Sequence, residues 1–466
     1  MERSIQLRAL LNFLFMERKQ KLYKMSQYNY MIDHKGKNLF FNGVTGAGFC
    51  MTKSELEQLD PLLSNLEQFQ ADYPDDFERL RNLGYIIDKE RNELEYLKYK
   101  NKEEVFLKKD YRIFINPTLE CNFHCWYCYE KHPKGFMTKE TMDKIKKHLQ
   151  LKIETDKITS LNLSWFGGEP LMYFYEIVYP LSLFAKDLCE KNHIPFILTM
   201  TTNGYLIDEK MVEKIDEIGL HSFQITVDGH RERHNKIRNN NGTPSYDKII
   251  ENINLLCKNI EKIKVTLRIN YDNQTLKKQY GEQILNDIEK ENRNKIHIDL
   301  QRVWQTTRNN MDQNNENIAS LMDAAKNAGY KKMSCSGGIT PGAFYNCYVC
   351  KFHYVELNYD GKVYKCTARD YVEPYEMGEL KDDGSILWNE ERLSKLYGSA
   401  TFDNLTCLKC AYLPLCWGPC PQKMVELKEQ GIEGYCVIRH IERSMRDRII
   451  DTYESSVDYA KQIIMS

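Results

Sequence analysis

The sequence has almost no net charge and no long hydrophobic run. Its 65 Lys and Arg residues balance 66 Asp and Glu residues, and the formal net charge is -1. A generic nucleic-acid-binding protein is strongly basic, so we expect no nucleic-acid partner. The longest apolar stretch near the start, residues 9–16, is interrupted by Asn12 and is too short to span a bilayer. No small-residue cleavage site follows it, so we expect a cytoplasmic protein with no membrane partner.

Cysteine, in contrast, is abundant. Fifteen cysteines occur in a long chain that shows no export signal, and clustered cysteines in such chains bind metals more often than they form disulfides. Three of them lie within residues 121–128 and nine within residues 335–436. The other three, Cys50, Cys189 and Cys257, lie among apolar residues or on helical patterns, and we expect them to be buried structural thiols.

Residues 1–108 are predicted to form a small N-terminal α+β region. Two short apolar runs, residues 28–32 and 38–42, flank a polar turn at 33–36, which indicates a β-hairpin. An amphipathic helix is expected to open near Thr52, and a further strand signal follows it.

Residues 109–330 show a regular alternation of strand and helix patterns. The expected strands are at 112–116, 160–165, 196–201, 223–227, 265–270 and 296–300. Helical patterns between them include residues 139–153, 209–218 and 246–259. Repeats of this spacing predict βαβ units and a parallel sheet. Six units are too few to close an eight-unit barrel, so the predicted α/β fold is an open, partial (β/α)6 TIM-like barrel.

Residues 331–466 lack this alternation. Residues 335–436 are rich in loops and cysteines, and one hairpin is predicted, with strands at 354–357 and 363–365. A segment with so little core of its own would need metal in order to fold. A closing amphipathic helix is predicted from the helical spacing of Ile441, Met445, Ile449 and Ile450.

The first cysteine group directly follows the first predicted barrel strand. It reads Cys-Asn-Phe-His-Cys-Trp-Tyr-Cys, with its thiols at Cys121, Cys125 and Cys128. Three thiolates on one short loop can hold three irons of a cubane cluster. The fourth iron would stay open to a substrate, by the logic that separates catalytic from structural zinc sites. The alternative is a cysteine-rich zinc knuckle with His124 as the fourth ligand.

The CxxxCxxC spacing after the first barrel strand resembles the hallmark of the radical S-adenosylmethionine (SAM) family. The resemblance implies a [4Fe–4S] cluster and reductive cleavage of SAM. The product of that cleavage would be a 5′-deoxyadenosyl radical that abstracts a hydrogen atom. Further motifs similar to those of the family follow the later strands, at the ends where α/β barrels build their sites.

The resemblance implies SAM contacts at nine residues, namely Tyr127, Gly167, Gly168, Glu169, Thr202, Asn203, Thr226, Asp228 and Arg238. Tyr127 stands where the family places an aromatic or apolar residue beside the adenine. Glu169 belongs to a Gly-Gly-Glu motif that binds the amino group of the SAM methionine in the family. Thr202 and Asn203 resemble the polar turn near the ribose. Arg238 is the candidate clamp for the SAM carboxylate.

Three further polar residues lie near these motifs. Asn270 ends the fifth predicted strand and is a weaker candidate for the same pocket. His230 and His234 follow the fourth strand, where surface loop histidines are the alternative to a functional role. We assign neither histidine a catalytic role.

The second cysteine group resembles the SPASM domain of radical SAM maturases. The downstream spacing is C-x2-C-x5-C-x3-C with a further cysteine after it, and a G-x4-C motif lies upstream. The resemblance implies two auxiliary [4Fe–4S] clusters and therefore three clusters in all. The distal cluster would take Cys407, Cys410, Cys416 and Cys436. The proximal cluster would take Cys347, Cys366 and Cys420, with Cys335 favoured as the fourth ligand and Cys350 as its alternative.

Auxiliary clusters have a chemical use in such an enzyme. Hydrogen-atom abstraction leaves a substrate radical, and forming a new bond from that radical requires the loss of one more electron. A fully ligated cluster nearby is a ready acceptor for this electron. The expected reaction is therefore oxidative, with a flavodoxin- or ferredoxin-type protein as the electron donor for SAM cleavage.

The SPASM resemblance implies a peptide or protein substrate, and two enzyme classes compete. One is a maturase that crosslinks a ribosomally made peptide, and the other is an anaerobic sulfatase-maturating enzyme that makes formylglycine. In the sulfatase branch an acidic residue directly follows the hairpin cysteine, whereas Thr367 follows Cys366 here, which favours the peptide maturase. Residues 1–108 would then bind a leader peptide by β-augmentation, or would simply stabilise the protein. A non-enzymatic electron carrier, the third class, would not need residues 167–169.

Overall fold

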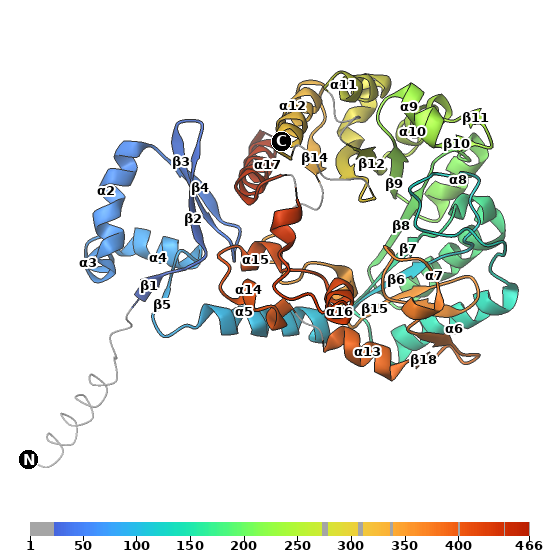
Figure 1. Ribbon diagram of the computed structural model, residues 1–466, viewed down its shortest axis with the longest axis horizontal. Helices are drawn as coiled ribbons and strands as arrows, with labels where there is room; N and C mark the ends of the chain where they lie inside the picture. The colour runs from blue at the N-terminus through green and yellow to red at the C-terminus, as the bar shows by residue number, and fades with distance from the viewer. Residues whose placement is uncertain are drawn as a thin grey trace, which may run out of the picture.

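The computed structural model describes residues 23–272, 278–305, 311–335, 339–398, 401–441 and 443–465. An eleven-stranded sheet dominates it, with the order β14-β13-β12-β9-β8-β7-β6-β15-β16-β17-β18 (Figure 1). The pairings from β14 to β15 are parallel, and those from β15 to β18 are antiparallel. The parallel strands are β6 (Asp110–Ile115), β7 (Ser160–Trp165), β8 (Phe196–Thr202), β9 (Ser222–Val227), β12 (Lys264–Tyr271), β13 (Ile296–Arg302), β14 (Lys332–Cys335) and β15 (Tyr354–Leu357).

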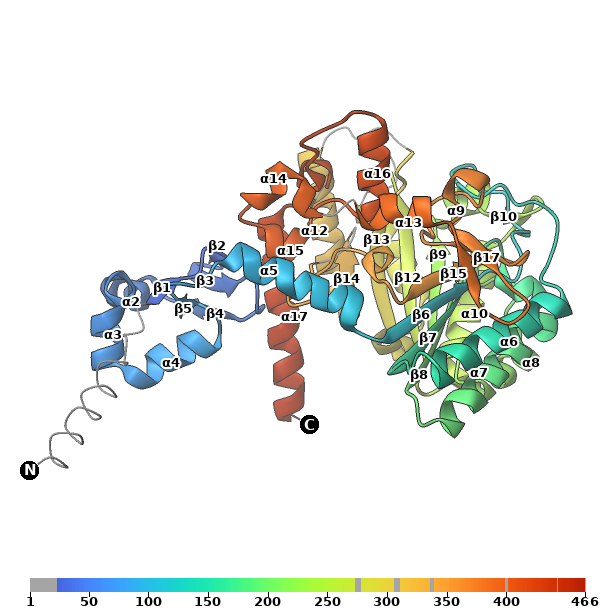
Figure 2. The ribbon, with the colours of Figure 1, turned by 90° about the horizontal axis from the view of Figure 1, so that it is seen from below.

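The parallel strands form the predicted partial barrel. Successive side chains of β6 point to opposite faces of the sheet. Tyr111 and Ile113 are buried in the main core on one face, and Phe114 lines a cavity on the other. The outer face is covered by α6 (Lys139–Glu154), α7 (Tyr179–Lys191), α8 (Glu209–Glu217), α10 (Tyr246–Asn259), α11 (Lys278–Asp287) and α12 (Met311–Asn327) (Figure 2). Among the described strands, no pairing closes the sheet on itself.

The barrel sheet is wider than the six predicted strands. β14 extends it beyond β13, and β15 pairs with β6 on the other side, where Tyr354 lies opposite Arg112. Both added strands lie after residue 330, where the barrel pattern stops in the sequence. The cysteine-rich segment therefore supplies part of the barrel sheet.

The N-terminal region contains the predicted hairpin. β2 (Asn29–His34) and β3 (Lys37–Asn42) pair around Lys35 and Gly36, whose φ angles of 53° and 75° suit a tight hairpin turn. β4 (Gly48–Met51) completes a three-stranded sheet, and β1 (Tyr23–Met25) pairs with β5 (Ile86–Asp88). The helices are α2 (Lys53–Ser64), α3 (Leu66–Asp72) and α4 (Pro74–Asn82). Thr52 and Glu55 form a capping box that fixes the start of α2.

The cysteine-rich segment packs against the N-terminal region. It holds the antiparallel strands β16 (Lys362–Tyr364), β17 (Gly378–Leu380) and β18 (Ile386–Trp388), and the helices α13 (Glu390–Tyr397), α14 (Leu405–Leu408), α15 (Leu413–Cys416) and α16 (Pro421–Glu429). Leu97 of α5 (Glu93–Lys102) is fully buried in one cluster with Tyr28, Cys407 and Trp417. The N-terminal region therefore shares a core with the second cysteine group.

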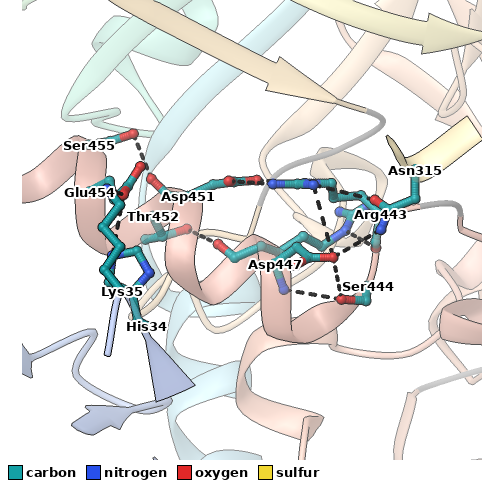
Figure 3. Close-up of polar contacts among 11 residues, drawn as sticks. His34, Lys35, Asn315, Arg443, Ser444, Asp447, Asp451, Thr452, Glu454 and Ser455 are labelled. Atoms are coloured by element: carbon teal, nitrogen blue, oxygen red, sulfur yellow. Dashed lines mark hydrogen bonds and ion pairs between the residues drawn. The ribbon is translucent and has the colours of Figure 1, made fainter. Parts of the chain in front are cut away.

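The last helix, α17 (Met445–Met465), connects the N-terminal hairpin with the barrel (Figure 3). Glu454 forms ion pairs with His34 and Lys35 of the hairpin. At the start of the helix, Asn315 of α12 donates a hydrogen bond to Asp447 at 3.2 Å. No helix in the described part of the chain is long and apolar enough to cross a membrane.

Candidate functional site

The first cysteine group lies on the loop between β6 and α6, at the carboxyl ends of the parallel strands. The amide of Cys128 donates to the carbonyl of Cys125 at 3.0 Å, which folds the loop into a tight turn. Burial raises the pKa of the Cys121 and Cys128 thiols to about 12 and also raises that of Cys125. Cys125 adds to the rise at both Cys121 and Cys128, so the three thiols lie close together, as a shared metal site requires.

Two glycines let the loop after β7 approach the cysteine loop. A Cβ atom on Gly168, whose φ is +48°, would lie 2.1 Å from the carbonyl oxygen of Glu120. A Cβ atom on Gly167 would lie 2.6 Å from Cγ of Asn116. The amide of Gly168 donates to Glu130 at 2.7 Å, just beyond the third cysteine. Only glycine fits this close contact between the two loops.

Glu169 is fully buried, and its carboxylate binds groups of its own chain. Oε1 accepts hydrogen bonds from the Leu171 amide at 3.0 Å and the Thr202 hydroxyl at 2.6 Å, and Oε2 accepts from the Asn203 amide at 2.7 Å. Burial raises the pKa of Glu169, and these hydrogen bonds oppose that shift. The carboxylate thus joins the loops after β7 and β8. That Glu169 binds the SAM amino group stays a prediction.

Asn203 continues this connection to the cysteine loop, because its side-chain amide donates to Asn122 Oδ1 at 2.7 Å. The predicted polar turn at 202–203 therefore lies beside the first cysteine group. Sequence reasoning did not assign Asn122 a role, although it lies directly after Cys121.

Tyr127, Asp228, Arg238 and Asn270 meet in one hydrogen-bonded group. The Tyr127 hydroxyl donates to Asp228, at 2.8 Å from Oδ1 and 2.6 Å from Oδ2. It accepts from Arg238 at 2.9 Å and from Asn270 at 3.1 Å. Burial raises the pKa of Asp228, and the positive charge of Arg238 opposes the shift. Four residues named from separate sequence motifs thus share one site. Thr226, which was also predicted to contact SAM, is buried on the adjoining strand β9.

The Nε–H group of Arg238 is available to donate a hydrogen bond to a ligand. Its Nε is buried and has no hydrogen-bond partner among the residues that the structure describes, and an unpaired buried donor is costly unless a ligand binds it. A guanidinium group with this geometry fits a carboxylate such as that of SAM.

His234 is buried rather than exposed on the surface. Its Nδ1 accepts from the Asp228 amide at 3.2 Å, and its Nε2 lies 3.0 Å from the Ser245 hydroxyl. Ser245 in turn donates to the Arg238 carbonyl at 2.6 Å. Burial lowers the pKa of His234 well below its ordinary value, so the ring is neutral. His234 therefore holds the backbone of Asp228 and Arg238 in place.

The second cysteine group divides into two sets in space. In one set, burial raises the pKa of Cys407 to about 12, and Cys416, Cys410 and Cys436 add to the rise. This is the set predicted for the distal cluster. No three Cys, His, Asp or Glu residues in the described ranges surround a single-ion site, but a cubane takes its thiolates at separate corners. That these four cysteines hold a cluster stays a prediction.

The other set contains Cys347, Cys350, Cys366 and Cys420. Burial raises the pKa of Cys347, Cys350 and Cys366 to about 12, and Cys420 contributes to each rise. The amide of Cys350 donates to the Cys347 carbonyl at 3.0 Å, so both thiols belong to one turn.

Cys335 was favoured from the sequence as the fourth proximal ligand. It is on β14, with its sulfur 3.7 Å from the Tyr271 hydroxyl, and it influences the pKa of Arg443 and Arg448. Mutual influence on the pKa groups Cys350 with Cys347, Cys366 and Cys420. Which of Cys335 and Cys350 is the fourth ligand stays a prediction.

A cavity of about 590 Å³ lies inside the barrel, between the two cysteine regions. Cys128 and Tyr127 line it on one side, and Thr367 and Ala368, which follow Cys366, line it on the other. The Thr367 carbonyl accepts a hydrogen bond from Tyr129, and its hydroxyl contacts that of Tyr348. A substrate in this cavity would lie between the first cysteine group and the proximal set.

Comparison with known proteins identifies the superfamily to which the barrel region belongs. The model of the radical SAM superfamily matches residues 115–278. These residues form a radical SAM domain. The superfamily consists of enzymes that perform radical chemistry, and it implies a [4Fe–4S] cluster and SAM.

Curated relatives match only part of this chain. A serine-type anaerobic sulfatase-maturating enzyme of Bacteroides thetaiotaomicron is 29% identical over 151 residues, covering 30% of this chain and 34% of the relative. A GTP 3′,8-cyclase of Helicobacter pylori is 26% identical over 191 residues, covering 40% and 53%. The matched region thus spans about a third to a half of these relatives.

Solved structures with the same fold match over more of the chain. SuiB of Streptococcus suis bound to S-adenosylmethionine has a TM-score of 0.50 and 17% identity, covering 91% of this chain and 99% of that one. The enzyme anSMEcpe with bound AdoMet has a TM-score of 0.50 and 17% identity, covering 76% and 98%. At this identity the likeness shows the fold alone.

Proposed function

We propose that the protein is a radical SAM peptide maturase with three [4Fe–4S] clusters that oxidatively crosslinks a ribosomally made peptide. The observation that carries this proposal is the barrel cavity, which Cys128 lines on one side and Thr367 on the other. One substrate can therefore face the first cysteine group and the loop of Cys366 together. Such an arrangement suits hydrogen-atom abstraction followed by removal of an electron.

In this proposal, SAM cleavage takes place at one end of the cavity and removal of the electron at the other. Cys121, Cys125 and Cys128 would hold the cluster, which would supply the electron for SAM cleavage. Arg238 would bind the SAM carboxylate, and Asp228 would hold Tyr127 and Arg238 in position. A substrate in the cavity would lose one hydrogen atom to the radical derived from SAM. It would then lose one proton to solvent and one electron to a cluster held by the proximal set, so two hydrogens would leave in total.

Sulfatase maturation is the second candidate, and the curated sulfatase-maturating relative favours it. Thr367 argues against it, because it occupies the position after the hairpin cysteine and its polar groups are engaged by Tyr129 and Tyr348. The next acidic residue, Asp370, accepts from the Lys131 amide at 3.3 Å and from its own neighbour Tyr371. The match to a radical SAM domain disfavours the third class, an electron carrier.

The N-terminal region supports a peptide substrate. Its sheet has the order β2-β3-β4, and in the described residues the outer edges of β2 and β4 pair with no other strand. A leader peptide could add to such an edge by main-chain hydrogen bonds. A flavodoxin- or ferredoxin-type protein would supply the electron for SAM cleavage.

The test is anaerobic incubation of the reconstituted protein with SAM, a strong reductant and short candidate peptides encoded beside its gene. Mass spectrometry should find a product that has lost two hydrogens and kept all its sulfur. The control is the Cys121→Ala, Cys125→Ala, Cys128→Ala triple variant, which should form neither product nor 5′-deoxyadenosine. Conversion of a sulfatase-derived peptide to an aldehyde, with no reaction of any precursor peptide, would favour the second candidate.

A further inference from the structure

Three polar side chains lie side by side on the wall of the barrel cavity. Gln224 of β9 lies between Thr201 of β8 and Thr266 of β12, because the register of the sheet places each threonine directly opposite it. All three residues line the cavity. Side chains at one register position on adjacent strands stand next to each other on the same face of a sheet. This polar row therefore presents two hydroxyl groups and one carboxamide group to the cavity.

The polar row is not engaged by the rest of the protein. No hydrogen bond joins the side chain of Thr201, Gln224 or Thr266 to any other residue that the structure describes. Ser164 and Thr199, which line the same cavity, differ from them because their hydroxyl groups bond each other at 2.6 Å. Barrel interiors are usually packed with branched apolar side chains. Unengaged donors and acceptors at this position therefore favour the binding of a ligand.

The polar row lies deeper in the barrel than the candidate SAM group. Gln224 comes four residues before Asp228, and Thr266 comes four residues before Asn270. Four residues of a parallel strand span about 13 Å, at about 3.3 Å per residue. The side chains that meet at the Tyr127 hydroxyl are thus at the carboxyl ends of the strands, and the polar row is left for a different molecule.

The surroundings of the polar row favour a neutral ligand. His297 of β13 is next in register beyond Thr266, and burial lowers its pKa, so the ring adds no charge. One layer nearer the mouth, Arg268 and Asp299 form an ion pair at 3.6 Å and offset each other. A carboxamide group and two hydroxyl groups together offer donors and acceptors without charge. The ligand that uses both kinds of group is another carboxamide.

We propose that Gln224, with Thr201 and Thr266, binds the side-chain carboxamide of an Asn or Gln residue in the peptide substrate. The inference rests on the proposed function and names a feature of its substrate. Two carboxamide groups can pair head to tail, because each has an N–H donor and an acceptor oxygen on one edge. The threonine hydroxyls then bond the second N–H and the second lone pair. The subsite holds a neutral side chain deep in the barrel, and the reacting residue of the same peptide would lie nearer the mouth.

The test is anaerobic affinity selection of a peptide mixture by the full-length, cluster-reconstituted, SAM-loaded protein. The probes are acetylated tetrapeptides with an N-methylamide end, so that no primary carboxamide is present at the terminus. One position of each probe is Asn, Gln, Leu, Asp or Glu, and the other three vary among residues without a carboxamide. Mass spectrometry of the bound fraction should show about tenfold enrichment of the Asn or Gln members over the other three kinds, since two neutral hydrogen bonds are at stake.

The variants Gln224→Leu and Thr266→Val separate recognition from folding. Gln224→Leu should lose the preference for carboxamides and gain one for the Leu members, because an apolar side chain then faces the ligand. Thr266→Val removes one hydroxyl at nearly constant shape and should reduce the preference by about two- to tenfold. Gln150→Leu, at an exposed position on the outer helix α6, is the matched control and should keep the wild-type preference. Iron content and circular dichroism are measured on each variant to establish folding.

A wild type that enriches all five kinds of member alike would overturn the proposal. Uniform weakening of every member by Gln224→Leu would also overturn it, because a purely structural role has that effect. The test is independent of turnover. Carboxamide selection without any peptide product would refute the maturase function but not the subsite. Equal product from peptides with and without Asn or Gln would refute only the subsite.

Discussion

Tyr127 donates its hydroxyl hydrogen bond to Asp228, whose two carboxylate oxygens lie 2.6 and 2.8 Å from the phenol oxygen. This contact joins the cysteine loop after β6 to the loop after β9, across the mouth of the barrel. Tyr127 stands directly before Cys128, so the contact also positions the third thiol. Arg238 donates to the same hydroxyl, which couples the thiol loop to the candidate carboxylate clamp.

Tyr127→Phe should weaken SAM binding without removing the first cluster. The change leaves the buried Asp228 carboxylate and Arg238 without their shared partner, at a cost of about 1–3 kcal/mol. We expect the SAM concentration for half-maximal 5′-deoxyadenosine formation to rise about tenfold or more, at unchanged iron content. Tyr175→Phe, at an exposed tyrosine (49%), is the control. An unchanged SAM requirement would contradict this role of Tyr127.

Cys350→Ala and Cys335→Ala should differ in the iron that the protein retains. Cys350 belongs to the proximal set with Cys347 and Cys420, so its loss should cost up to one cubane, roughly four irons per chain. Cys335 lies against Tyr271 on β14, and its replacement should leave the iron content unchanged. Iron and sulfide analysis after anaerobic reconstitution decides between them, and the reverse result would identify Cys335 as the ligand.

His148 should make the protein less stable in weak acid. Its Nδ1 lies 2.7 Å from the Gly384 carbonyl and its Nε2 lies 2.6 Å from the Tyr111 hydroxyl. Burial lowers the pKa of His148 from 6.5 to about 4, because the folded protein disfavours the charged ring. Its stabilising contribution is therefore complete above about pH 6.5 and is lost as the pH falls toward 4, to a total of about 3 kcal/mol.

Denaturant unfolding of the wild type and His148→Gln at pH 7.5 and pH 5 tests this effect. The difference in unfolding free energy between the two proteins should shrink at pH 5, and contributions common to both cancel. His193→Gln, at an exposed histidine, should show no such change. A constant difference between the wild type and His148→Gln would show that His148 does not titrate.

Leu97→Ala should destabilise the region of the distal cysteine set. Leu97 lies in the N-terminal region but is fully buried against Cys407 and Trp417, and loss of a buried Leu side chain costs about 2–5 kcal/mol. We expect a lower thermal midpoint and reduced iron content. Leu107→Ala, at a residue 70% exposed, is the control. Full retention of iron in Leu97→Ala would show that the distal set folds independently of α5.

Because Leu97 packs against Cys407 and Trp417, deletion of the N-terminal region would not test leader binding alone. Removing residues 1–100 would uncover the distal cysteine set and would also remove any leader-binding edge. Substitutions on the outer edge of β2, such as Met31→Glu at 60% exposure, are the sharper test of leader binding. They should weaken binding of a leader peptide and leave the iron content intact.

Local sequence patterns predicted most of the fold. The strand pattern at 160–165 and the helix pattern at 246–259 coincide with β7 and α10, because each buries a regular apolar face. The added strands β14 and β15 were not predicted as parts of the barrel, since their partners β13 and β6 are set by long-range pairing. Short apolar runs of this kind carry no signal of which strand they join.

Only part of the candidate site was predicted from the sequence, because contacts between distant segments carry no local signal. Motif spacing identified Tyr127, Asp228 and Arg238, which the structure brings into one group. Spacing alone did not reveal that Glu169 is enclosed by its own chain or that His234 is buried. Both properties depend on how the loops pack against one another, and no single loop encodes that packing.

The pairing of β6 with β15 has a consequence for synthesis on the ribosome. Arg112 and its neighbours emerge early, but the strand that covers their outer edge, with Tyr354 opposite Arg112, is translated much later. Until then the first barrel strand presents unpaired amides and carbonyls, a template for association with another nascent chain. A shortened gene that stops after the radical SAM domain would leave this edge open permanently. Such a fragment should aggregate during expression, whereas one extended through the β15–β16 hairpin should stay dispersed.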